Sequence, residues 1–411
     1  MSPELLREIS KRYLLPFFSG ARLEEGTITS TTRADRVAYE NLLSIKFKVN
    51  LKDRYRLVLT RSQPFTFSVS RSVTEIDVVR AFCDILSDME TQLEGPLKND
   101  LLSTFQRRVV ARALQAKTVE STILSGIDRL VQWGERLYEG APISASLGFR
   151  ESDNKHYPTL SEIGSLDFAA VLSNGFDTIL EFDHDQGFMS LQPLDANQSL
   201  LFKSPMRHGH IAQWTSSNRS RIAMTLNRLG EILIFRENEL IFARRSGRWH
   251  YLTHDPVISQ MNVPHDRALR QAIYGTCLDA SFARTGACIG VVSVNQSKKW
   301  KSLISKDDVL SECQSVKART LRKVVRGTLF SNLDRKVRQE LAAIDGATII
   351  AHTGEILAVG AILRVPGGSE GGGRLAAAKA LSQYGLGIKV SQDGSITGYR
   401  RNKPEAAFRI M

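Results

Sequence analysis

The chain has 411 residues, of which 42% are hydrophobic and 24% charged, and its formal net charge is +12. This composition is that of a folded globular protein, and the length allows about two or three domains. No run approaches the roughly 18 apolar residues of a membrane span, and the first residues lack a signal-peptide core, so we expect a cytoplasmic protein. The positive charge permits nucleic acid, an anionic membrane surface or polyphosphates as partners, but no nucleic-acid motif supports the first.

Residues 1–141 predict an N-terminal α/β domain that could act as a sensor. Alternating apolar residues indicate strands at 43–49, 55–60 and 65–69. Helical spacing follows at 74–93, 97–116 and 119–138. Nothing in this segment has catalytic spacing. Packing of these helices onto their own sheet is the alternative to a sensor or dimerisation role.

Residues 142–262 predict a β-rich module. Short alternating runs at 178–182, 221–226, 231–235 and 239–243 are separated by Gly, Asn and Asp turns, which is typical of a meander. Two polar groups in this module allow more than one interpretation. The first could hold a metal or simply form polar turns, and consists of Asp183, His184, Asp185, His208 and His210. The second could pair with and stack on a nucleotide, or form a charged surface hairpin, and consists of Arg244, Arg245, Arg248 and Trp249.

The four cysteines are Cys83, Cys277, Cys288 and Cys313, and they lack the Cys-x-x-Cys spacing of metal or redox motifs. Such cysteines suit a reducing compartment. We expect them to be buried and inert.

Residues 263–411 predict a third domain, a mixed sheet flanked by helices. A helix is expected at 265–283, and apolar runs follow Asp345. A glycine-rich loop at 367–373 leads into a helix, and two strands at 388–391 and 395–399 form a hairpin. The fold class expected for the chain is therefore multidomain α/β (α+β).

The glycine-rich loop favours an anion. Gly371, Gly372 and Gly373 can bring backbone N–H groups close to a phosphate at a helix N-terminus, and Arg374 adds a guanidinium. The spacing matches neither the P-loop nor the dinucleotide-binding fingerprint. A surface loop without a ligand is the alternative.

The last third of the chain resembles the diadenylate cyclase (DAC) domain of bacterial proteins. The resemblance rests on the order Asp-Gly-Ala, strand, hairpin, strand, glycine loop, Arg-x-x-Ala-Ala-x-x-x-Ser and a strand ending in Val-Ser. The segment 278–294 is similar to the opening helix and first strand of that domain.

The resemblance implies a site and a reaction. Asp345 would bind the catalytic Mg²⁺ or Mn²⁺ and help to activate a ribose 3′-hydroxyl, with Gly346 and Ala347 beside the nucleotide. The glycines 371–373 with Arg374 would hold the phosphates, and Ser391 would contact one of them. The implied reaction condenses two ATP molecules into cyclic di-AMP. It needs two domains face to face, so a homo-oligomer is implied.

Three positions depart from the family pattern. Leu375, Ala376 and Gln392 stand where the family has histidine, arginine and glutamate. Loss of one well-placed hydrogen-bond donor weakens transition-state stabilisation by about 3–4 kcal/mol, so two such losses could abolish the reaction. A basic cluster could compensate or could be a solvated helix face; its members are Lys317, Arg319, Arg322, Lys323 and Arg326. The alternative function is a catalytically impaired, DAC-like nucleotide-binding sensor.

Overall fold

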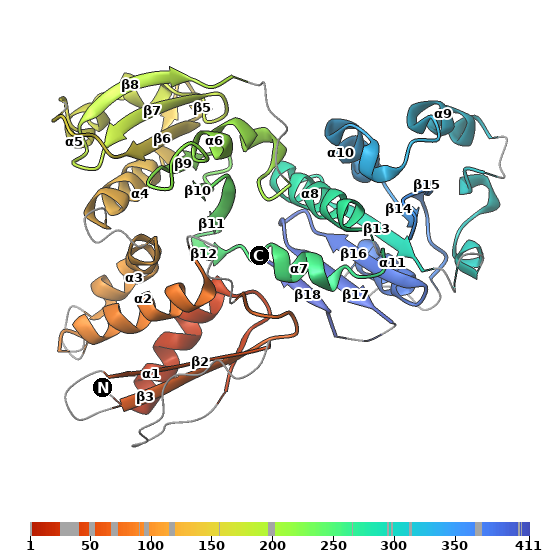
Figure 1. Cartoon of the computed structure of the whole chain (residues 1–411), viewed down its shortest axis with the longest axis horizontal. Coiled ribbons are helices and arrows are strands. Elements are labelled where there is room, and N and C mark those ends of the chain that lie inside the picture. The colour runs from red at the N-terminus through yellow and green to blue at the C-terminus, as the bar shows by residue number, and fades with distance from the viewer. Residues whose placement is uncertain are drawn as a thin grey trace. The chain divides into compact units, whose positions relative to one another are not determined.

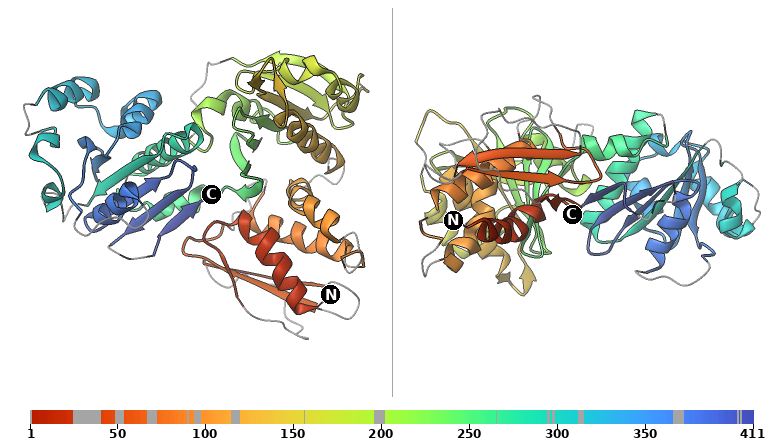
Figure 2. Two further views of the ribbon diagram at one scale, coloured as in Figure 1. Left: turned by 180° about the vertical axis from the view of Figure 1, so that it is seen from behind. Right: turned by 90° about the horizontal axis from the view of Figure 1, so that it is seen from below.

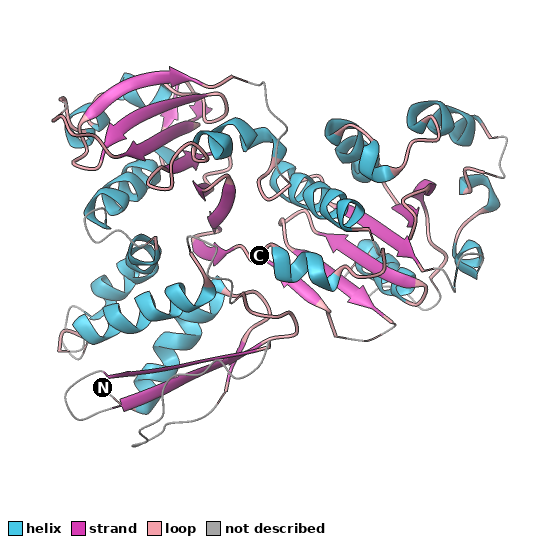
Figure 3. Cartoon of the chain, in the orientation of Figure 1, coloured by secondary structure: helices cyan, strands magenta, loops and turns pink. Residues whose placement is uncertain are grey.

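The computed structural model of the chain describes residues 2–24, 41–48, 54–66, 73–89, 91–93, 98–114, 120–155, 157–195, 202–264, 266–293, 296, 299–311, 315–365, 372–401, 403 and 405–411. The described chain forms two compact units, Met1–Thr253 and His254–Met411. Both units mix helices with strands (Figures 1 and 3), which confirms the multidomain α+β class. Among the described residues, no helix has the length and apolar character needed to cross a membrane.

The first unit begins with helices and a small sheet. Its early elements are α1 (Pro3–Ile9), a π-helical turn η1 (Ser10–Leu14), a 3₁₀ turn η2 (Leu15–Phe17), β1 (Arg22–Leu23), β2 (Leu42–Lys48), β3 (Arg54–Thr60), α2 (Glu75–Asp88), α3 (Lys98–Ala113) and α4 (Glu120–Gly134). The strands form an antiparallel sheet of order β1-β3-β2, and α2 packs against β2 (Figures 1 and 2). A reciprocal capping box between Thr74 and Asp77 starts α2.

The strands of the β-rich segment belong mainly to a seven-stranded sheet of order β12-β11-β10-β9-β6-β7-β8. The elements of this segment are β4 (Leu137–Tyr138), β5 (Ala141–Pro142), β6 (Ala145–Arg150), α5 (Leu160–Gly164), η3 (Asp167–Val171), β7 (Thr178–Asp183), β8 (Phe188–Pro193), η4 (Met206–His208), α6 (Gly209–Trp214), β9 (Ile222–Leu226), β10 (Ile232–Arg236), β11 (Glu239–Arg245) and β12 (Arg248–Tyr251). The meander from β9 to β12 confirms the sequence prediction, whereas β6 and β7 pair in parallel. One core cluster of this unit runs from Leu6 to Tyr251.

Two predictions in the first unit were wrong in detail. Phe65 and Thr66 lie in a loop rather than a strand. Backbone groups here bond to side chains and not to a neighbouring strand, because Thr66 N–H donates to the Glu75 carboxylate and the Arg61 guanidinium donates to Pro64 O. The remainder of that predicted strand lies outside the described residues. The helix expected to reach residue 138 ends at Gly134, since the positive φ angles of Glu139 (49°) and Gly140 (79°) fold a hairpin between β4 and β5.

The second unit is a six-stranded mixed sheet of order β15-β14-β13-β16-β17-β18 with helices around it. Its elements are α7 (Asp255–Gln260), α8 (Arg267–Ala283), β13 (Ala287–Val292), η6 (Lys299–Leu303), η7 (Lys306–Asp308), α9 (Val316–Val325), η8 (Phe330–Asn332), α10 (Arg335–Ala343), β14 (Ala347–Ala351), β15 (Ile356–Ala361), α11 (Gly373–Ser382), β16 (Gly385–Val390), β17 (Ile396–Arg400) and β18 (Phe408–Ile410). The pair β13–β14 is parallel and the other pairs are antiparallel.

Helices cover both faces of this sheet, as the sequence predicted. A Cβ added at Gly290 in β13 would meet the side chain of Leu381 in α11, so α11 lies on that face. On β14, the hydroxyl of Thr348 donates to Leu341 O in α10, while the neighbouring Ile349 belongs to the core cluster that includes Leu381. Because successive residues of a strand face opposite sides, α10 and α11 lie on opposite faces.

Candidate functional site

Strand register brings the ends of three neighbouring strands together in the second unit. Ile289 of β13 is paired with Thr348 of the parallel strand β14, and Ala287 is paired with Val390 of the antiparallel strand β16. The residues that precede β13 and β14 and the residue that follows β16 therefore lie at one end of the sheet (Figure 1). These are Gly286, Asp345 and Ser391. Neighbouring strands are about 5 Å apart, so the three backbones fall within the span of one nucleotide.

Arg374, in the first turn of helix α11, lies at the same end of the sheet. The helix packs tightly on β16, because a Cβ at Gly387 would overlap the carbonyl of Ala378. Arg374 Nη2 donates to Thr285 O at 3.4 Å, and a Cβ at Gly286 would collide with its guanidinium. Arg374 thus lies across the start of β13.

The N-terminus of α11 is open. Gly372 caps the helix with a φ of 90°, a conformation that favours glycine, and a Cβ at Gly372 or Gly373 would meet no atom of the described residues within 4 Å. The first N–H groups of a helix have no partner within it. They can therefore donate to an anion here. Gly371 lies outside the described residues.

Asp345 is an exposed residue between α10 and β14, and within the described part of the chain its carboxylate has no hydrogen-bond or ion-pair partner. Two glycines fix the backbone around it. Gly346 has a φ of 100° and no room for a Cβ, which would lie 2.7 Å from Ala361 O. Gly360 has a φ of 58°, and its Cβ would lie 3.0 Å from Asp345 O. The close contact between the start of β14 and the end of β15 therefore fixes the backbone position of Asp345.

Lys317 supports this corner, and a buried ion pair joins the neighbouring helices α8 and α10. Lys317 of the basic cluster donates its Nζ to Gly360 O at 2.7 Å and to Asp308 Oδ1 at 2.6 Å. Arg335 at the start of α10 forms a double hydrogen bond with Asp279 of α8, with distances of 2.7 and 2.9 Å. The Asp279 side chain is 1% exposed. Sequence reasoning missed this pair, although an aspartate among the apolar residues of a buried helix was a signal.

Ser391 lies at the predicted end of the sheet, but its hydroxyl forms a hydrogen bond within the turn that follows β16. It hydrogen-bonds the carboxylate of Asp393, and Ser391 N–H donates to Ser395 O. Partial burial acts to raise the pKa of Asp393, but hydrogen bonds from Ser395 and Ser391 and the charge of Lys389 outweigh it and lower that pKa. A phosphate contact by Ser391 stays a prediction.

The other members of the basic cluster lie on α9 and at its C-cap. Arg322 donates to Leu310 O, while Arg319, Lys323 and Arg326 are exposed. The four arginine and lysine side chains line one shallow depression. They form the solvated helix face that was one of the two interpretations, whereas Lys317 reaches the corner of Asp345.

The metal hypothesis in the first unit was not supported. Among the described residues, no three His, Cys, Asp or Glu side chains gather to hold a metal ion. Asp183 instead accepts from the N–H groups of Asp185 and Gly187 in a turn. His208 is fully buried, stacks on Phe176 and is hydrogen-bonded to Gly175 O, and burial lowers its pKa to about 4.

The cysteines are buried where they are described. Cys83, Cys277 and Cys288 are buried and form no disulfide among the described residues, and burial raises the pKa of Cys277 and that of Cys288, the latter to about 12. This confirms the expected burial of these three, whereas their inertness stays a prediction. Cys313 lies outside the described residues.

Comparison with known proteins adds little. No family model matches the chain, and no curated protein matches it in sequence. Among solved structures, a crystal structure of a double mutant of DacA from Staphylococcus aureus matches 35% of this chain and 88% of its own, with 16% sequence identity and a TM-score of 0.24. A similarity of this size does not assign a function to the chain.

Proposed function

We propose that the unit His254–Met411 binds ATP with a divalent cation at the sheet end described above, and that two copies condense two ATP molecules into cyclic di-AMP. One observation carries the proposal. Asp345, the open N-terminus of α11 with Arg374, and Ser391 come from three separate segments and meet at one end of one sheet.

The donors at this end suit a phosphate with its metal. Mg²⁺ is commonly held by one or two carboxylates together with substrate phosphates and water. The exposed, unpaired carboxylate of Asp345 supplies one such ligand, and the first turn of α11 and Arg374 supply positive charge for the phosphates. A bound metal would polarise a phosphoryl oxygen and favour deprotonation of the attacking hydroxyl.

The chemistry requires two copies of the unit. In each of two steps a ribose 3′-oxygen forms a bond to the α-phosphorus of the other ATP, and the bond to the β-phosphate breaks. The hydroxyl proton is lost and pyrophosphate leaves. Each site holds one nucleotide, and the face-to-face placement of two sites supplies the attacking group. The N-terminal unit would regulate this assembly as a sensor.

A nucleotide sensor without catalysis is the second candidate. Leu375 and Ala376 follow Arg374 with side chains that carry no charge, and Gln392 is neutral as well. With only one guanidinium retained at this position, binding is easier to support than phosphoryl transfer, because transition-state charge needs more preorganised donors.

Product analysis separates the two candidates. The purified chain is incubated with ATP and Mg²⁺ or Mn²⁺ and analysed by chromatography and mass, beside Asp345→Asn and the matched control Asp153→Asn, which changes an exposed aspartate of the first unit. Cyclic di-AMP from the parent and Asp153→Asn, but not from Asp345→Asn, supports the cyclase. Metal-dependent ATP binding without product supports the sensor. Absence of metal-dependent ATP binding overturns both.

A further inference from the structure

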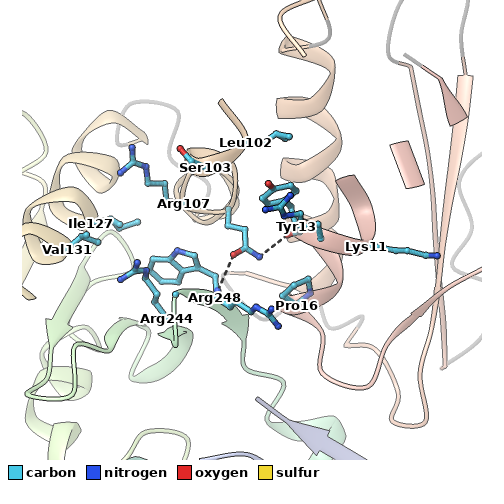
Figure 4. A pocket seen from close by; sticks show the side chains of 14 residues that line it. Lys11, Tyr13, Pro16, Leu102, Ser103, Arg107, Ile127, Val131, Arg244 and Arg248 are labelled. Atoms are coloured by element: carbon cyan, nitrogen blue, oxygen red, sulfur yellow. Dashed lines mark hydrogen bonds between the residues drawn. The ribbon is translucent and has the colours of Figure 1, made fainter. Parts of the chain in front are cut away.

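A cavity of about 480 Å³ lies within the first unit, far along the chain from the sheet end of the second (Figure 4). Four parts of the chain form its wall: the turns η1 and η2, helix α3, helix α4 and the hairpin of β11 and β12. Its volume is within the range of about 300–1,000 Å³ of small-molecule sites.

The cavity wall is strongly basic. Lys11, Arg12, Arg107, Arg244 and Arg248 line it. No aspartate or glutamate is among the described residues that line it. Five cations from four elements thus line one hollow. The stick view shows Arg107, Arg244 and Arg248 on one side of it, whereas the Lys11 side chain extends away from these three (Figure 4).

Only part of this charge is neutralised from outside the cavity. Arg107 forms an ion pair with Asp128 of α4. Burial lowers the pKa of the Arg244 guanidinium, while the carboxylate of Glu135 raises it and the charge of Arg107 lowers it again. Arg12 lies 5.4 Å from the centre of the Tyr13 ring. Two carboxylates against five cations leave an excess of positive charge, and an anion in the hollow would relieve the repulsion.

The walls are held in place without a ligand. Gln106 of α3 donates to Tyr13 O at 3.0 Å and accepts from Trp249 N–H at 3.4 Å, so one side chain ties α3 to η1 and to β12 (Figure 4). Leu102, Ile127 and Trp249 are buried and contribute apolar surface. Trp249 is only 3% exposed, so its ring belongs to the wall and is not free to stack as the sequence had suggested.

The neighbouring arginine has a different role. Arg245 lies between two cavity residues in sequence, but it points into the core and forms an ion pair with Glu231, with Nε and Oε1 2.7 Å apart and both side chains at most 4% exposed. Successive residues of a strand face opposite sides. Arg244 therefore lines the cavity, whereas Arg245 lies in the interior and pairs with Glu231.

We propose that this cavity binds a small polyphosphate anion of nucleotide size. A hollow of this limited volume fits such a ligand better than a nucleic-acid backbone, which follows a long groove. Guanidinium groups match phosphate oxygens in geometry and charge. None of the described residues that line the cavity carries a carboxylate to hold a metal, so binding requires no divalent cation. This separates it from the sheet end of the second unit.

The test measures binding of inorganic tripolyphosphate and of ATP to the full chain by calorimetry, in EDTA, at low and at moderate salt. The double variant Arg244→Gln/Arg248→Gln is expected to lose at least about tenfold in affinity for both ligands, because two charge-assisted hydrogen-bond partners are removed. The matched control Arg219→Gln/Arg228→Gln removes the same charge at exposed positions outside the cavity, and should change affinity less than about twofold. Tighter binding of ATP than of tripolyphosphate would show that the apolar wall also recognises the nucleoside.

Several results would overturn the proposal. These are the absence of binding in EDTA, an equal loss in the two double variants, or a loss that follows Arg374→Gln instead. Tighter binding of a single-stranded oligonucleotide than of tripolyphosphate, with a steep salt dependence, would identify nucleic acid as the ligand and overturn the small-anion assignment. Failure of ATP to yield cyclic di-AMP leaves this test unaffected, since EDTA excludes the metal-dependent site.

Discussion

The cavity of the first unit and the sheet end of the second attract phosphate by different means. The cavity is lined by side-chain cations, and the part of its wall that the structure describes has no carboxylate. The sheet end offers backbone N–H groups of α11, one arginine, and the carboxylate of Asp345, which has no partner among the residues that the structure describes. The first arrangement suits an anion by itself, and the second suits an anion that carries a metal.

Charges in the interior form a contrasting class. Arg61 and Glu75 are paired at 2.7 Å with side chains 1% and 0% exposed, and Glu75 also accepts from Thr66 N–H and the hydroxyl of Thr253. Here every charge has a partner. The comparison suggests that paired, buried charge determines stability, whereas unpaired charge beside a hollow or a helix end marks a ligand. The predictions that follow test this distinction.

The largest effect is expected from removing one member of the buried pair. Glu75→Ala leaves the Arg61 guanidinium buried without its partner, which typically costs about 3–5 kcal/mol of unfolding free energy. Chemical denaturation of the full chain measures it. The double variant Arg61→Met/Glu75→Leu should recover a large part of the loss, because no charge is then left unpaired. A loss of less than about 1 kcal/mol in the single variant would contradict the distinction.

Asp345→Asn should affect activity and leave stability unchanged. Loss of the metal ligand is expected to lower the rate of cyclic di-AMP formation about 100- to 1,000-fold, by analogy with loss of one well-placed electrostatic contact. The exposed position predicts a change in unfolding free energy within about 0.5 kcal/mol. A large drop in stability would instead place Asp345 among the structural charges.

Acid should weaken the first unit through His208. Its pKa is about 4 when folded, against an ordinary value of 6.5, so the unfolded chain binds the proton more readily. The stabilisation is complete above pH 6.5 and is lost as the pH falls towards 4. Between pH 7 and 4.5, His208 alone should account for about 2–3 kcal/mol of unfolding free energy. Denaturation curves at the two pH values measure this, and His208→Phe should show a correspondingly smaller difference; the same difference in both would exclude His208 as the cause.

The smallest effects concern two glycines of the second unit. Gly387→Ala would force its methyl group against the backbone of α11 and should cost about 1–3 kcal/mol, with displacement of Arg374 and weaker ATP binding. Gly373→Ala places its methyl group in open space at a helix start and should be neutral or stabilise by up to about 1 kcal/mol. Thermal unfolding of the two variants compares them. Equal effects would contradict the close packing of α11 on β16 at Gly387.

Local pattern was enough to predict most elements. The amphipathic run of α8, the β9–β12 meander and the β16–β17 hairpin were predicted within a few residues, because apolar periodicity and turn residues act over short distances. The chemistry of Asp345 and Arg374 could also be suggested from their sequence neighbours. The division at 141 and 142 stays a prediction, although one core cluster of the first unit spans that point.

The tertiary structure alone decided which of these residues meet. The parallel register of β13 and β14 places Asp345 at the same end as Arg374, and no local pattern encodes that register. Lys11 and Arg107 are 96 positions apart and Arg107 and Arg244 are 137 apart, yet the three line one cavity. By itself the sequence determined the periodicity of the helices and strands and the residue types at the loops. Long-range packing decided the pairings, since burial and strand register depend on partners far away in the chain.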